Sequence, residues 1–123
     1  MVENMKLLRY GQPGAERPGL LAPDGTLRDL SAVVGDIAGD TLSDASIASL
    51  RAIDPASLPL VPAGTRIGPC VGAVGKFICI GLNYSDHAAE SGMAVPAEPV
   101  VFMKATSCIS GPDDDVIIPR GSS

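Results

Sequence analysis

Glycine and proline interrupt this chain at short intervals, and their spacing restricts it to short elements of secondary structure. There are 14 glycines and 11 prolines in 123 residues. Both residues are poorly tolerated inside helices and central strands, so a chain interrupted in this way is rich in turns and loops. This composition is typical of β or α+β proteins. With the elements predicted along the chain, we expect an α+β fold, in which a small β-rich N-terminal domain carries one helix.

The N-terminal residues predict a strand followed by a hairpin. Residues 5–10, MKLLRY, read as a first strand. Two short apolar runs within residues 18–30 flank Pro23-Asp24-Gly25, and an Asp-Gly pair between apolar runs is a strong turn signal. These residues therefore predict one strand and then a two-stranded hairpin.

A short helix is predicted after this hairpin. Apolar residues recur at helical spacing between residues 41 and 53, and Thr41 with Asp44 resembles a capping box. Pro55 then ends the helix. We interpret it as a helix that packs on the sheet.

Residues 54–69 carry four prolines, which indicates an extended and stiff connection. We place the domain boundary here, with residues 1–68 as an N-terminal domain that includes the proline-rich linker. Residues 69–123 form the second domain. In it we expect strands at 76–80, 100–104 and 116–118, and an acidic turn at 113–115.

The second domain gives the impression of being interrupted, because the chain stops at Ser123 soon after its last predicted strand. A pair of strands with one or two partners buries too little apolar surface to be stable alone. We therefore expect a truncated domain, and poor solubility if the chain is produced by itself.

The charge excludes some classes of partner. A net charge of −5 argues against nucleic acid and against an anionic membrane surface. No apolar run approaches the roughly 20 residues that a membrane-spanning helix needs, and the first residues lack the apolar core of a signal peptide. A cytoplasmic protein is expected.

The three cysteines are Cys70, Cys79 and Cys108. Their number is odd, and none is paired at the close spacing of a zinc or redox site. Each has apolar neighbours, so we expect buried, reduced thiols.

The only histidine lies in residues 78–92, ICIGLNYSDHAAESG. Ser85 or Asp86 can cap a short helix that runs to Ser91, with Gly92 after its end. His87 and Glu90 then lie three residues apart on one face. A carboxylate beside an imidazole fixes its tautomer, and such a pair can take a proton from water. His-x-x-Glu is a weak pattern, and from spacing alone an exposed His–Glu pair on a solvated turn is the favoured interpretation.

Three motifs follow one another in this half of the chain. Residues 81–90, GLNYSDHAAE, follow the pattern G-x-N-Y-x-x-H-x-x-E; residues 99–104, PVVFMK, follow P-x-x-F-x-K; and an acidic turn precedes residues 117–119, IIP. In this order they resemble the N-terminal part of the fumarylacetoacetate hydrolase superfamily. Residues 5–30 also resemble the small N-terminal domain of bacterial members, among them diketo sugar-acid hydrolases and ureidoglycolate lyase-like proteins.

The resemblance implies a fold and a chemistry. The second domain would be the truncated start of the mixed β catalytic fold of that superfamily, whose members act on β-diketo and related oxo acids. They cleave C–C bonds through an enolate chelated by Mg²⁺ or Mn²⁺. His87 would be the general base that activates water, and Glu90 would orient that water. The implied substrate-binding residues are Asn83, Tyr84 and Lys104.

The metal ligands of that superfamily are carboxylates in a Glu-x-Glu motif beyond the point where this chain stops. We therefore name no metal ligand here and expect neither Mg²⁺ nor Mn²⁺ to bind this chain alone. The run Asp113-Asp114-Asp115 is the alternative, but three consecutive residues on a turn point in divergent directions.

Two functions remain open. One is the N-terminal part of a metal-dependent hydrolase or lyase for a small oxo acid, inactive as this short chain. The other is a non-catalytic module that keeps the N-terminal domain for association. Members of the superfamily usually dimerise through the catalytic domain, so a homodimer is also left open.

Overall fold

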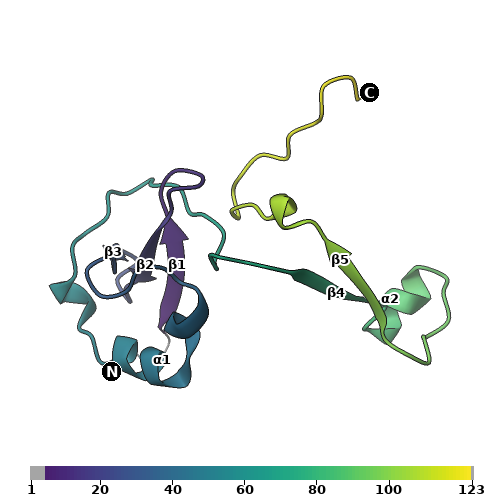
Figure 1. Cartoon of the computed structure of the whole chain (residues 1–123), viewed down its shortest axis with the longest axis horizontal. Helices are drawn as coiled ribbons and strands as arrows, with labels where there is room; N and C mark the ends of the chain where they lie inside the picture. The colour runs from purple at the N-terminus through teal and green to yellow at the C-terminus, as the bar shows by residue number, and fades with distance from the viewer. Residues whose placement is uncertain (1–4, 123) are drawn as a thin grey trace. The chain divides into compact units, whose positions relative to one another are not determined.

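The computed structural model describes residues 5–122, which form two compact units (Figure 1). The first consists of residues 5–73 together with residues 110–122, and the second is Val74–Ile109. Each unit has one small antiparallel sheet and short helices, so the expected α+β class is confirmed. The domains 1–68 and 69–123 stay a prediction, because a compact unit is not by itself a domain.

The sheet of the first unit is a three-stranded antiparallel meander of β1 (Lys6–Tyr10), β2 (Arg17–Leu21) and β3 (Leu27–Asp29). The turn between β2 and β3 forms as predicted. Gly25 takes a φ of 82°, which suits glycine, and the Asp24 carboxylate accepts a hydrogen bond of 2.9 Å from the Thr26 backbone N–H. The local sequence therefore determines this hairpin.

The helix of the first unit, α1 (Asp44–Arg51), begins later than predicted. Its N-cap is Ser43, whose hydroxyl accepts a bond from the Ser46 N–H, so the capping box at Thr41 is wrong. Thr41 instead lies in a 3₁₀ turn, η1 (Gly39–Leu42). The extended backbone of Ser43 separates the two elements and leaves its side chain free to cap α1.

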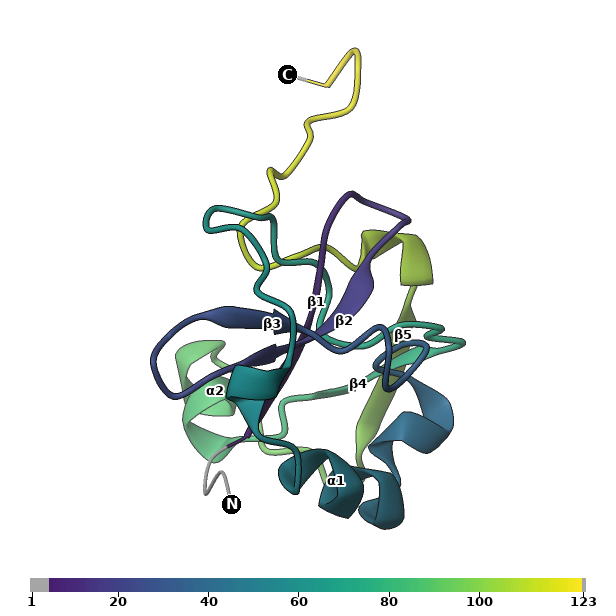
Figure 2. The ribbon, with the colours of Figure 1, turned by 90° about the vertical axis from the view of Figure 1, so that its left-hand side faces the viewer.

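The proline-rich segment packs onto this sheet. It contains a 3₁₀ turn, η2 (Pro55–Ser57), and then runs antiparallel to β3 and β1 through isolated bridges of Leu60 and Ile67. Leu58 and Val61 are buried. Figure 2 shows the sheet and α1 from a second side.

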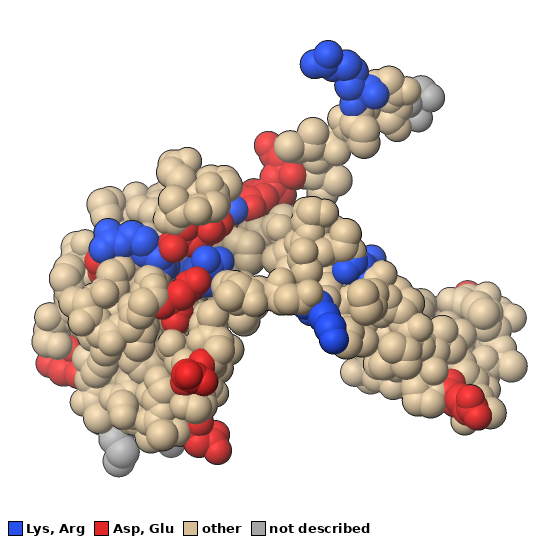
Figure 3. Space-filling view, in the orientation of Figure 1, with Lys and Arg blue, Asp and Glu red and all other residues tan. Residues whose placement is uncertain are grey.

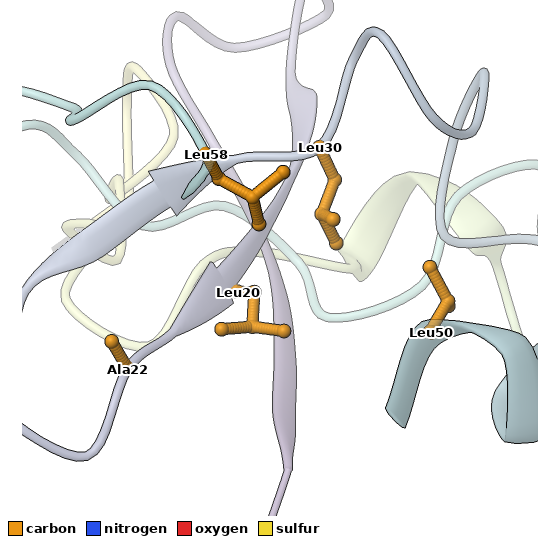
Figure 4. Packing of buried hydrophobic residues seen from close by; sticks show 5 residues of the cluster. All are labelled: Leu20, Ala22, Leu30, Leu50 and Leu58. Carbon is orange, nitrogen blue, oxygen red and sulfur yellow. The ribbon is translucent and has the colours of Figure 1, made fainter. Parts of the chain in front are cut away.

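The core of the first unit is aliphatic. Figure 4 shows side chains from β2, α1 and the connecting segments that converge on Leu20, which is fully buried. The cluster consists of Leu20, Ala22, Leu30, Leu50 and Leu58. This packing is what the alternation of short apolar runs and turns in the sequence predicts.

The second unit contains β4 (Phe77–Gly81), α2 (Ser85–Glu90), β5 (Val100–Lys104) and a 3₁₀ turn, η3 (Thr106–Cys108). The strands pair antiparallel, with Phe77 opposite Lys104 and Gly81 opposite Val100. Both strands and the helix were expected from the sequence. None of the helices between residues 5 and 122 is long and apolar enough to cross a membrane.

The predicted strand at residues 116–118 is wrong. Among the described residues this segment pairs with no strand, and Val116 is 94% exposed. Residues 116–118 are Val-Ile-Ile, which favour a strand, but no strand in the described part of the chain is present for them to pair with. Strand formation depends on such a partner and not on propensity alone.

The expectation of buried cysteines is also wrong. Cys70 and Cys108 are exposed and Cys79 is half-buried, and all three are free thiols. Apolar neighbours in sequence did not bury them, because Cys70 lies in a loop and Cys79 and Cys108 lie in the thinly covered second unit.

Candidate functional site

The candidate catalytic residues lie on α2, directly after the turn that ends β4. Tyr84 is the N-cap and makes no side-chain capping bond, so the predicted caps Ser85 and Asp86 are wrong. The Asp86 carboxylate accepts a bond of 2.9 Å from the His87 N–H. Gly92, with a φ of 65°, follows the C-cap Ser91 as expected.

His87 and Glu90 are both exposed on this helix, one turn apart. Ala88 is the one buried residue of this helix and is 1% exposed. The Met93 N–H donates to the carbonyl of Ala88 and closes the end of the helix. The imidazole and the carboxylate are therefore exposed on a helix whose buried residue is Ala88.

The turn between β4 and α2 is strained at Leu82. Leu82 has a φ of 49°, in the left-handed region that a leucine rarely adopts. Such residues persist where their surroundings hold them and are concentrated at binding and active sites. Here the conformation redirects the chain between the strand and the helix that carries His87.

Asn83 and Tyr84 follow this turn but differ in their surroundings. Asn83 lines a pocket of about 410 Å³ formed by residues 80–83 and 95–99. Tyr84 is 71% exposed and does not line it. The pocket lies at the end of the sheet where Gly81 pairs with Val100.

Lys104 lies at the other end of the sheet, opposite Phe77. Four residues of extended strand, about 13 Å, separate it from Val100 at the pocket end. The structure thus brings Asn83, Tyr84, His87 and Glu90 to one end of the second unit and leaves Lys104 at the other. Its role in binding substrate stays a prediction.

Glu98 also lines the pocket, and none of the sequence motifs had pointed to it. Glu98 lies between Ala97 and Pro99, in the segment that enters β5. The available signal was the pair Pro96 and Pro99, which restricts the backbone on both sides of Glu98.

The acidic run 113–115 belongs to the first unit, and its central residue forms an ion pair with Arg66. The Asp114 carboxylate accepts two bonds from the Arg66 guanidinium, 2.6 Å from Nε and 2.5 Å from Nη2. These bonds, with one from the Gly111 N–H, lower the pKa of Asp114 to about 2. Arg66 also donates to Glu16 at 3.0 Å.

This pairing bears on the metal that the sequence motifs imply. Across residues 5–122, no group of three or more His, Cys, Asp or Glu side chains could hold a metal ion. The central carboxylate of the acidic run is already paired with a guanidinium, which a cation would have to displace. Residues 5–122 therefore do not fit the Mg²⁺ or Mn²⁺ that the resemblance implies for members of the superfamily.

Comparison with known proteins gives a family and a set of relatives. The family described as "Fumarylacetoacetate (FAA) hydrolase C-terminal" matches residues 76–123, which include β4, α2 and β5. Proteins of Burkholderia multivorans and Burkholderia ambifaria, each named "Putative hydrolase", are 69% identical to this chain over 118 residues. A relative in Burkholderia cenocepacia is 68% identical.

The coverage of these relatives is unequal. The alignments cover 96% of this chain but 42% of each relative. The chain thus spans less than half of the length of the curated relatives that it matches.

Proposed function

Since this chain belongs to the fumarylacetoacetate hydrolase superfamily, we propose that it is part of a hydrolase or lyase that cleaves a C–C bond in a β-diketo or related oxo acid. One observation carries the proposal: the residues that match the family contain both candidate catalytic side chains. The family match over residues 76–123 includes α2, the helix that presents both His87 and Glu90 to solvent.

In this proposal His87 is the general base. Its imidazole takes a proton from a water molecule, and the resulting hydroxide attacks a substrate carbonyl carbon. The bond between that carbon and its neighbour breaks, the electron pair stays on the neighbouring carbon as an enolate, and a proton returns to it. Glu90, one turn along the same helix, accepts a hydrogen bond from the water and orients it.

The exposure of α2 supports a role for it as a lid. A base that is exposed in the free protein needs a substrate, or the surface behind it, to exclude bulk water during reaction. α2 is short, it is joined to the sheet by the strained turn at Leu82, and Ala88 is its one buried residue. We propose that it closes over bound substrate.

The divalent metal belongs to the proposal for the longer protein. No cluster among residues 5–122 could hold it, so its ligands would come from polypeptide that this chain does not supply. The proposal further includes a homodimer, a cytoplasmic location and a small oxo acid as the substrate.

The test is a chimera. This chain is joined to the part of the Burkholderia multivorans relative that it does not span, and the product is assayed on acylpyruvates and diketo sugar acids with Mg²⁺. The intact relative is the matched control. We expect turnover that a chelator abolishes and added Mg²⁺ restores.

A folded chimera without turnover, beside an active relative, would overturn the catalytic proposal. It would favour the alternative, a module that associates through the first unit.

A further inference from the structure

We propose that the pocket beside α2 is a subsite for a neutral, hydroxyl-bearing group, with Glu98 as its specificity-determining residue. The inference rests on the proposed function in one respect only: the hydroxyl group would belong to the oxo-acid substrate. Nothing in the sequence motifs or in the names of the relatives assigns a role to Glu98.

The position of the pocket connects it to the candidate base. Its two walls are residues 80–83, which end β4, and residues 95–99, which enter β5. The chain between those walls is the segment that contains α2. The pocket and His87 therefore lie in the same unit, at the same end of the sheet. A substrate bound near His87 can extend into the pocket.

The strained turn supports a binding role. Leu82 lies in the pocket wall with its left-handed backbone conformation, between Gly81 and Asn83. The turn brings Asn83 to the pocket and allows α2 to begin at Ser85. One local conformation thus determines both the wall of the pocket and the start of the catalytic helix.

The chemistry of the walls indicates the ligand. Ile80, Leu82 and Val95 provide apolar surface, and Glu98 is the one ionisable residue among those that line the pocket. A carboxylate accepts hydrogen bonds, and the Asn83 carboxamide both donates and accepts them. A hydroxyl group, which also donates and accepts, can bond to the carboxylate and to both ends of the carboxamide.

The same carboxylate disfavours anions. A ligand carboxylate placed beside Glu98 meets a like charge, at a site without a cation in its walls. The carboxylate of an oxo-acid substrate is therefore disfavoured in this pocket, and we place it elsewhere. The subsite selects substrates with an uncharged hydroxylated end over dicarboxylic ones.

The experiment uses the 123-residue chain in dilute solution and saturation-transfer NMR with two probes of four carbons. Erythritol carries hydroxyl groups only, and succinate carries two carboxylates. We expect a saturable signal from erythritol and a signal at least threefold weaker from succinate. Glu98→Ala should weaken the erythritol signal at least threefold, and Glu98→Gln should raise the succinate signal.

Asp115→Asn is the matched control, because it removes the same charge from an exposed residue of the other unit. It should leave both signals unchanged. Circular dichroism of each variant verifies that the fold is kept, and Glu98→Gln tests the charge if Glu98→Ala disturbs it. Equal erythritol signals from the native chain and from both Glu98 variants, or equal signals from the two probes, would overturn the subsite.

The outcomes separate this inference from the proposed function. An active chimera whose KM for hydroxylated substrates is unaffected by Glu98→Ala would remove the subsite and leave the hydrolase. Erythritol binding that depends on Glu98, beside an inactive chimera, would retain the subsite and remove the catalysis.

Discussion

Arg66 and Asp114, 48 residues apart, form a two-point ion pair in which Nε and Nη2 of the guanidinium each donate to one carboxylate oxygen. Fork-shaped pairing of this kind adds geometric specificity as well as energy. Residues 110–122 are part of the first unit although residues 74–109 precede them. The pair thus holds this returning segment on the unit that contains the three-stranded sheet.

The pair predicts a pH dependence of stability. The pKa of Asp114 is lowered to about 2 in the folded chain from an ordinary 3.8, so between these values the unfolded chain binds more protons. Its stabilising contribution is complete above pH 4 and is lost as the pH falls toward 2. Urea unfolding of Asp114→Asn should show a shallower loss of stability over this window.

Asp113→Asn is the control for this measurement, because Asp113 is exposed and neighbours Asp114. It should keep the native slope. A native slope in Asp114→Asn as well would show that the ion pair does not contribute.

A second prediction concerns Gly72, which has no room for a side chain. A Cβ at this position would overlap the Asp36 carboxylate, which accepts two bonds from Arg9 at 2.7 and 3.1 Å. Gly72→Ala should therefore displace this pair and destabilise the first unit by about 1–3 kcal/mol. Gly35→Ala is the control, since nothing lies within 4 Å of a Cβ there.

Urea denaturation followed by far-UV circular dichroism would measure both glycine variants. Equal midpoints would mean that Asp36 and Arg9 can move aside without cost, and that the close approach of Gly72 is not required.

A third prediction concerns the sheet of the second unit, which is apolar on both faces. Ile78 with Met103 and Ile80 with Val101 are cross-strand pairs on one face, and all four are exposed. Figure 3 shows few charged side chains over the visible face of this unit. Strands that are apolar on both faces are typical of sheets covered on both sides.

Exposed apolar strands of this kind promote association. Ile78→Thr with Met103→Thr should raise several-fold the concentration at which the chain begins to associate, measured by light scattering. Val33→Thr, a similarly exposed apolar residue of the first unit, is the control. An unchanged onset in the double variant would assign the association to another surface.

A fourth prediction concerns His87 in the active chimera. His87→Ala should lower kcat by about 10²–10⁴-fold, the range for a general base, with a smaller change in KM. Glu90→Gln should lower kcat less, because the amide still accepts a hydrogen bond from water. Ser91→Ala is the control on the same segment. Full activity of His87→Ala would assign the base to another residue.

Local sequence was enough to predict the elements that local chemistry controls. The hairpin turn at Asp24-Gly25 needs only a glycine at positive φ and a side chain that bonds its own backbone. The helix that carries His87 and Glu90 follows in the same way from a short polar segment that ends at Gly92. These features involve residues within a few positions of one another, so the sequence contains the information directly.

Tertiary structure decided what depends on partners distant in the chain. Propensity predicted a strand at residues 116–118, but no ladder reaches it. Asp114 could not be assigned to Arg66 before residues 110–122 were placed against the rest of the first unit. Lys104 could not be assigned to the end of the sheet away from the pocket before the register of β4 and β5 was known. Asn83 and Glu98 come to line one pocket because Gly81 pairs with Val100. Burial, ion pairs and pocket walls arise from contacts between segments that are distant in the chain. The spacing of residues in the sequence does not specify which segments come into contact.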